Sequence, residues 1–157
     1  MPIDEDEVYI GTKTLLQNQG WLILAGQPPS GSDHIPVIEI KDYFMTEKGS
    51  RKSYKPDLVA YKENKTLLVE CKPEHSDEDA IKLTKILTNP LRVQTLFDEL
   101  YQRNIFNRYK IILDRNSFAE NLCGALAHSG TVIPQTNLFI IYILNMYGEG
   151  EIIYPVA

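Results

Sequence analysis

Apolar and polar positions recur along the chain with helical spacing in some segments and with alternation in others, and these two patterns predict helices and strands. Turn-forming residues separate the elements, as in the loop QPPSGSDHIP and at the break Asn89-Pro90. The predicted elements, in chain order, are a helix over 4–19, strands over 21–26 and 37–44, a hairpin over 57–72, helices over 76–88 and 91–104, a strand over 109–114, a helix over 117–130, and strands over 137–147 and 151–157.

The order of these elements predicts a mixed α/β fold in which a central sheet carries helices on its faces. The sequence shows no internal repeats and no low-complexity segments. A chain of 157 residues is long enough for one sizeable core, so we expect a single domain over 1–157.

Composition and charge narrow the class of protein. Hydrophobic residues make up 43% of the chain and charged residues 24%, as in ordinary globular proteins. Apolar runs are too short to span a membrane and the N-terminus is acidic, so we expect neither a membrane protein nor export. Two cysteines, Cys71 and Cys123, form no disulfide framework, which favours the cytoplasm. The net charge of -5 argues against a free-standing protein that coats nucleic acid, but not against an enzyme whose positive charge is local or comes from a partner.

The hairpin KPDLVAYKENKTLLVECKP carries charged side chains within otherwise apolar strands. Asn64 suits a tight two-residue turn with positive φ, and counting back from such a turn puts Asp57 directly opposite Glu70. Cross-strand partners project to the same side with Cβ atoms roughly 5 Å apart, and Lys72 then lies diagonally from Asp57. An odd loop length would send Asp57 to the other face. With the even loop, the pattern predicts that two acids and a lysine converge.

Two carboxylates at this separation repel each other, and burial makes the repulsion costly unless a cation joins them. A hard divalent ion with oxygen ligands is the natural partner, with Mg²⁺ favoured and Mn²⁺ expected to substitute. The backbone carbonyl of Cys71 is a candidate further ligand, and the ammonium of Lys72 would help to orient an attacking water. These features predict a site for metal-assisted hydrolysis of a phosphodiester.

A plainer interpretation is that Glu70 and Lys72 are surface residues of an edge strand and that Asp57 caps a turn. The same E-x-K triplet occurs by chance in Glu39-Ile40-Lys41. Only the later triplet has a Pro-Asp pair a hairpin's length before it, within strands apolar enough to be central, which favours the site.

At these residues the sequence resembles the PD-(D/E)XK nuclease superfamily. Pro56-Asp57, twelve intervening residues and Glu70-Cys71-Lys72 fit its signature without a substitution. The resemblance implies Mg²⁺-dependent cleavage of DNA, in which Asp57 and Glu70 are metal ligands and Lys72 is the catalytic lysine.

The resemblance also implies a fold. The expected restriction-endonuclease-like core has the order α-β-β-β-α-β and covers about 4–114, with a C-terminal α-β-β extension over about 115–157 to which we assign no function.

Many members of that superfamily carry another metal-associated glutamate on the first helix, where this chain has four consecutive acids. At 100° per residue, Glu5 falls about 20° from Leu16, inside the apolar arc, whereas Glu7 falls about 180° from it. We therefore choose Glu5 as a further metal-site acid. The alternative is that these acids only complement the helix dipole, with Asp4 and Glu7 forming a capping-box-like pair.

A basic connection precedes the motif and would be useful for phosphate contacts. We expect DNA-binding roles for Lys48, Arg51, Lys52 and Lys55, with a merely solvated loop as the alternative.

The favoured function is a Mg²⁺-dependent DNA endonuclease in defence, recombination or repair. Cutting both strands with one site per chain calls for two sites, so we expect a homodimer or a partner subunit that supplies specificity. A Holliday-junction-type resolvase is one alternative, although such enzymes usually need strongly basic surfaces. A non-catalytic interaction subunit on a nuclease fold is the other, although such relics generally lose an acid or the lysine, and all three are present here.

Overall fold

The structure is a computed structural model that describes residues 3–31, 33–41 and 53–156. Its elements, in chain order, are α1 (Glu5–Asn18), β1 (Leu22–Gly26), β2 (Ile40–Lys41), β3 (Ser53–Tyr54), β4 (Leu58–Lys62), β5 (Lys65–Cys71), α2 (Asp77–Leu87), α3 (Pro90–Gln102), α4 (Ile105–Arg108), α5 (Arg115–Glu120), β6 (Leu122–His128), β7 (Phe139–Ile143) and β8 (Gly150–Ile153). No helix in these described ranges is both long and apolar enough to cross a membrane.

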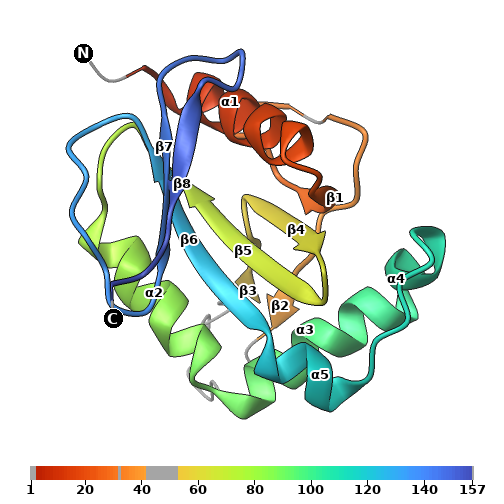
Figure 1. The fold of residues 1–157 in the computed structure, drawn as a ribbon. Coiled ribbons are helices and arrows are strands. Elements are labelled where there is room, and N and C mark those ends of the chain that lie inside the picture. Colours follow the sequence, from red (N-terminus) through yellow and green to blue (C-terminus); the bar gives the residue numbers. More distant parts are fainter. Residues whose placement is uncertain (1–2, 32, 42–52, 157) are drawn as a thin grey trace.

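A mixed six-stranded sheet forms the centre of the fold, with the strand order β1-β4-β5-β6-β7-β8. Strands β5, β6 and β7 run parallel to one another, while β1, β4 and β8 pair antiparallel with their neighbours. Strands β2 and β3 form a separate small ladder. Helix α1 covers one face of the sheet, and α2 and α3 cover the other (Figure 1). This architecture confirms the predicted fold class, a central mixed sheet flanked by helices.

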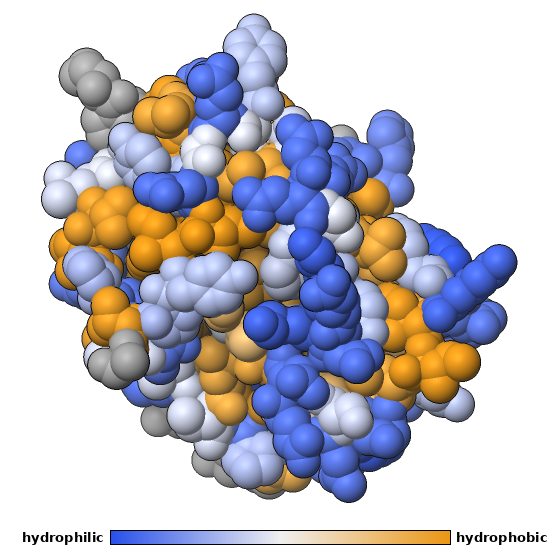
Figure 2. Space-filling view, viewed as in Figure 1, coloured by the Kyte–Doolittle hydropathy of each residue, from blue (hydrophilic) through white to orange (hydrophobic). Residues whose placement is uncertain are grey.

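The alternation of side chains along the strands explains the two layers of core. In β5, Leu67 and Val69 pack on the α1 side, whereas Leu68 packs on the side of α2 and α3. Each face of the sheet therefore has its own buried cluster, and β5 lies at the centre of both. On the outer surface, Figure 2 shows hydrophilic side chains in a band with apolar areas on either side.

The β4–β5 hairpin has the register that the sequence predicted. Its loop is the two residues Glu63 and Asn64, both with positive φ (49° and 68°), as a type I′ turn requires. Lys62 pairs with Lys65 and the ladder continues to its last pair, Leu58 with Val69. Because the side-chain period is two, this even loop sets the face of every residue in both strands.

Two predicted elements near the C-terminal half were wrong. The helix expected over 117–130 ends at Glu120, and β6 follows it in the middle of the sheet. The leucines and alanines of 122–128 suggested a helix, but small residues are needed here because α2 crosses the strand closely. A Cβ on Gly124 would come within 3.0 Å of Leu87 Cδ1 and 2.9 Å of Leu138 Cδ2. Tertiary packing overrides the local preference.

The strand expected over 109–114 is an irregular segment. Lys110 has a positive φ of 57°, which interrupts an extended backbone. Tyr109 and Ile111 pack against the core, whereas Ile112 is 96% exposed. The alternation of buried and exposed side chains is therefore present, but it belongs to a loop that lies against α3 and α4. The strand that follows the helices and joins the sheet is β6, and not the strand predicted over 109–114. Of the strand expected over 37–44, Ile40–Lys41 is paired, and residues 42–44 lie outside the described ranges.

Helix α1 approaches the turn after β7 closely at Gly11. A Cβ at this position would collide with the backbone carbonyl of Asn145 and lie 2.7 Å from Ile143 Cγ2. Backbone atoms cannot move aside as a flexible side chain can, so the position requires glycine.

We expect Gly11→Ala to lower the free energy of unfolding by about 1–3 kcal/mol, because the overpacking outweighs the roughly 1 kcal/mol by which alanine favours a helix. Urea unfolding measures this. Gln17→Ala, on the exposed side of the same helix, should be neutral or stabilising. A Gly11→Ala protein as stable as that control would show that α1 does not pack this closely.

Candidate active site

Asp57 and Glu70 lie side by side at the end of the hairpin remote from its turn. The backbone N–H of Asp57 donates to Glu70 Oε2 (3.1 Å), and the backbone N–H of Cys71 donates to Asp57 Oδ2 (2.8 Å). Each acid is thus held by the backbone of the opposite strand. Glu70 is only 4% exposed. The structure therefore brings these two predicted site residues together, with Glu70 buried and Asp57 partly exposed.

The surroundings of Asp57 disfavour its charged form. Burial and, after it, the neighbouring carboxylates of Glu70 and Glu5 together raise the pKa of Asp57 to about 7. The Cys71 N–H and the Lys72 ammonium act in the opposite direction without cancelling it. A carboxyl group whose charged form is disfavoured, next to the buried carboxyl group of Glu70, forms a site that a cation would stabilise.

Lys72 lies just after β5 and points toward the first residue of α1. Its Nζ is 3.7 Å from Glu5 Oε1, and its backbone N–H donates to the carbonyl of Ala127 in β6. Partial burial opposes the charge of Lys72, but Glu5 and the other nearby acids raise its pKa above the ordinary value. The lysine therefore stays charged at the edge of the carboxylate pair.

Glu5 is the acid of the first helix that faces this site. Asp4 is the N-cap and accepts from the N–H of Glu7, as the capping alternative expected, and Asp6 accepts a hydrogen bond from Ser30. Each of these acids has a local structural task, whereas Glu5 pairs with Lys72. The choice made from helical geometry agrees with this placement.

Sequence reasoning missed Lys82, which lies on α2 and reaches the same pair of acids. Its Nζ is 2.6 Å from Glu70 Oε1 and 3.4 Å from Asp79 Oδ1, and it lies 4.9 Å from the centre of the Tyr54 ring. A signal was available in the sequence. Asp79 shares the buried face of α2 with Leu83, and an acid on such a face needs a cation, which Lys82 supplies three residues later.

A hollow of about 420 Å³ opens beside this lysine. It is lined by Ile40, Ser53, Tyr54, Lys55, Lys82, Ile86 and Arg92. Lys55, one of the predicted DNA-binding residues, is exposed at this hollow. The other three, Lys48, Arg51 and Lys52, lie outside the described residues. Three cationic side chains around one hollow suit the binding of a phosphate.

The residues present fit a hard divalent cation in the chemistry of their donors. Asp57 and Glu70 offer carboxylate oxygens, and Cys71, whose carbonyl is the predicted further ligand, directly follows Glu70 in sequence. Within the described ranges, no three His, Cys, Asp or Glu side chains are already grouped to hold a metal. Mg²⁺ does not require such a cage, because it usually keeps several waters and binds through one or two carboxylates.

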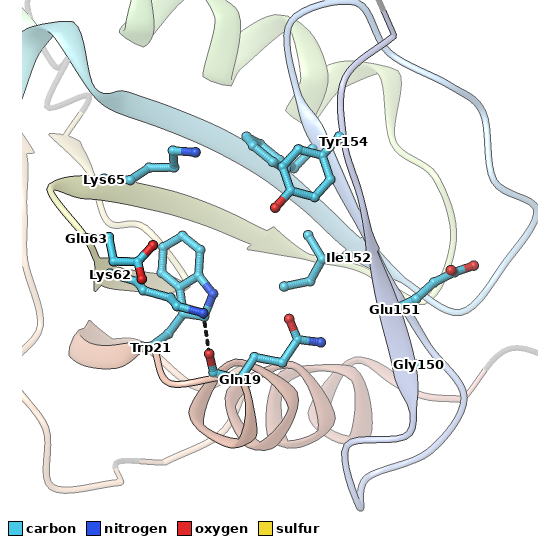
Figure 3. Close-up of a pocket in the computed structure, with 10 residues that line it drawn as sticks. Gln19, Trp21, Lys62, Glu63, Lys65, Gly150, Glu151, Ile152 and Tyr154 are labelled. Carbon is cyan, nitrogen blue, oxygen red and sulfur yellow. Dashed lines mark hydrogen bonds between the residues drawn. The ribbon is translucent and has the colours of Figure 1, made fainter.

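A second hollow, of about 290 Å³, lies at the opposite end of β5 (Figure 3). Lys62 and Lys65 line it together with Trp21 and Tyr154, but Glu63 and Glu151 are there too, so its charges balance. Lys65 and Glu70 are five positions apart on β5, which is a distance of roughly 17 Å along the strand. This hollow therefore takes no part in the chemistry of the carboxylate pair.

Comparison with known proteins connects the carboxylate pair to a family. Residues 44–91, about a third of the chain, match the family model of the archaeal Holliday junction resolvase (Hjc). This family is a member of the PD-(D/E)XK superfamily. The predicted resemblance is confirmed. The matched segment contains Asp57, Glu70, Lys72 and Lys82. No curated protein and no solved structure matches the chain.

The raised pKa of Asp57 has a consequence for stability. An acid whose pKa is higher in the folded than in the unfolded state binds an extra proton on folding, here between about pH 4 and pH 7. Stability must therefore fall as the pH rises through this window. In EDTA, we expect Asp57→Asn to be more stable than the wild type by up to about 4 kcal/mol at pH 8 and by less than half of that difference at pH 5.

Urea unfolding at the two pH values measures this difference. Glu120→Gln, which removes an exposed carboxylate, should follow the wild type at both. If Asp57→Asn were equally destabilised or equally neutral at pH 5 and pH 8, Asp57 would not be the group that titrates.

Proposed function

We propose that this protein is a metal-dependent DNA endonuclease and that branched DNA of the four-way junction type is its substrate. The observation that carries the proposal is the backbone-held pair Asp57 and Glu70, which lies within the segment that matches a resolvase family. The family match favours the junction over the duplex substrates of other nucleases. The acidic composition alone had made a junction resolvase the less favoured alternative, because such enzymes usually need strongly basic surfaces.

In this proposal Asp57, Glu70 and the Cys71 carbonyl hold Mg²⁺, or Mn²⁺ in its place. The ion polarises the scissile phosphate and lowers the pKa of water at the site. The two N–H groups that fix the carboxylates keep the donor oxygens in place. Burial of Glu70 keeps bulk water away and strengthens every electrostatic contact in the site.

Lys72 orients the attacking water and stabilises the negative charge that develops at the phosphate. Its half-exposed ammonium can reach a substrate at the surface, since its side chain is 45% exposed. Glu5 positions this ammonium, and as a further acid near the pair it also remains our candidate for an additional metal contact. Removing Glu5 should therefore weaken activity less than removing Lys72.

Net charge constrains how the DNA is held. With a net charge of -5, the chain attracts DNA only where its cations are gathered, as they are around the hollow of Lys55, Lys82 and Arg92. Symmetrical cutting of a junction needs two sites. A homodimer, or an assembly with a partner subunit, would provide the second site and a wider positive surface.

Cleavage of a labelled four-way junction tests the proposal. We expect wild-type protein with Mg²⁺ or Mn²⁺ at low salt to cut the junction in preference to a linear duplex of the same arms. Asp57→Ala and Lys72→Met should each lower the cleavage rate by 100-fold or more, because each removes a group that acts on the reacting phosphate.

Lys65→Met is the matched control, since Lys65 lies on the same strand at the end away from the acids. It should cleave as the wild type does. Equal cutting of junction and duplex would overturn the proposed preference for a junction, but the proposed nuclease activity would stand. Metal binding without cleavage of any DNA would favour the non-catalytic alternative.

A further inference from the structure

Both oxygens of the Glu70 carboxylate are engaged by other groups of the protein. Oε2 accepts from the Asp57 N–H, and Oε1 is 2.6 Å from the ammonium of Lys82. The donor to Oε2 is a backbone N–H at the base of the hairpin, so its position is set by the pairing of β4 with β5. The contact to Lys82 comes from the tip of a long side chain on another element.

The ammonium of Lys82 thus occupies a position next to the oxygen that a divalent ion would use. Two cations that share one carboxylate repel each other strongly in a buried place. A divalent ion that binds Glu70 must therefore displace Lys82 or bind weakly. The side chain of Lys82 is 43% exposed and has four rotatable carbons, so it has room to turn away.

A destination for the displaced ammonium lies next to it. Lys82 lines the hollow that also contains Lys55 and Arg92, and its present position over the Tyr54 ring is at the wall of this hollow. Lys55 and Lys82 line this hollow together, and a DNA phosphate placed there would accept hydrogen bonds from both ammonium groups.

Given the proposed metal-dependent nuclease, on which this inference rests, we propose that Lys82 is an exchangeable counter-ion. It neutralises Glu70 in the metal-free protein, leaves that carboxylate when a divalent ion binds, and turns to a DNA phosphate in the adjoining hollow. Lys82 is thus a positioning residue that couples metal binding to DNA binding.

A purely structural role makes a different prediction. Lys82 also pairs with Asp79 one turn away on the same helix, at 3.4 Å. If its task were only to neutralise Asp79 and hold α2 against the sheet, its removal would loosen the site. Affinity for metal and affinity for DNA would then both fall.

The test measures the two affinities separately and without cleavage. Mn²⁺ is titrated into DNA-free protein at pH 8 by calorimetry, and binding of a junction is measured with Ca²⁺ in place of Mg²⁺. We expect Lys82→Gln to bind Mn²⁺ about 5- to 10-fold more tightly than the wild type and to bind the junction several-fold more weakly. Opposite signs are the signature of the exchange, because a damaged fold lowers both affinities.

Two further variants sharpen the experiment. Lys82→Arg keeps the charge and can grip a carboxylate with two hydrogen bonds, so it should bind Mn²⁺ more weakly than the wild type. Lys85→Gln removes an exposed lysine from the same helix and should change neither affinity. The exchange is overturned if Lys82→Gln binds Mn²⁺ no more tightly than the wild type.

The outcomes also separate this inference from the proposed function. Wild-type protein that binds Mn²⁺ and cleaves DNA, together with a Lys82→Gln protein of unchanged metal affinity, removes only the role given to Lys82. Absence of Mn²⁺ binding in the wild type and in every variant overturns the metal site and the exchange together.

Discussion

Two hydrogen bonds from backbone N–H groups to side-chain carboxylates hold a pair of acids together at the base of the β4–β5 hairpin, and the arrangement of the charges around them depends on this constraint. Asp57 donates its N–H to Glu70, and Cys71 donates its N–H to Asp57. These contacts hold the two carboxyl groups close to each other. Two lysines offset the negative charge of this acidic cluster: Lys72 lies near Glu5, and Lys82 pairs with Glu70.

The parts of the site that depend on short-range geometry could be predicted from the sequence. A two-residue turn at Asn64 fixes which face carries Asp57 and Glu70, and the 100° step of a helix selects Glu5 among four acids. The contact between Lys82 and Glu70 could not be predicted by counting residues in this way, because it depends on where α2 lies across the sheet.

The same distinction explains the errors in the fold. Residues 122–128 have a composition that suits a helix, and only the close crossing of α2 over Gly124 makes a strand the better choice. Residues 109–114 have the apolar alternation of a strand but no neighbouring strand to pair with. A pattern predicts which side chains are buried better than it predicts the element that buries them.

The hairpin also has a consequence for the order in which the protein folds. Asp57 and Glu70 are 13 residues apart in the chain, whereas the parallel pairing of Glu70 with Leu126 joins residues 56 positions apart. Short loops close at lower entropic cost, and hairpins form within microseconds. The two acids therefore meet early, before α2 is docked on the far strand β6 and Lys82 is in place. Because the folded site disfavours the charged form of Asp57, ionisation of this group should oppose the early step, so the carboxylate pair that we propose as a metal site works against the folding of its own hairpin.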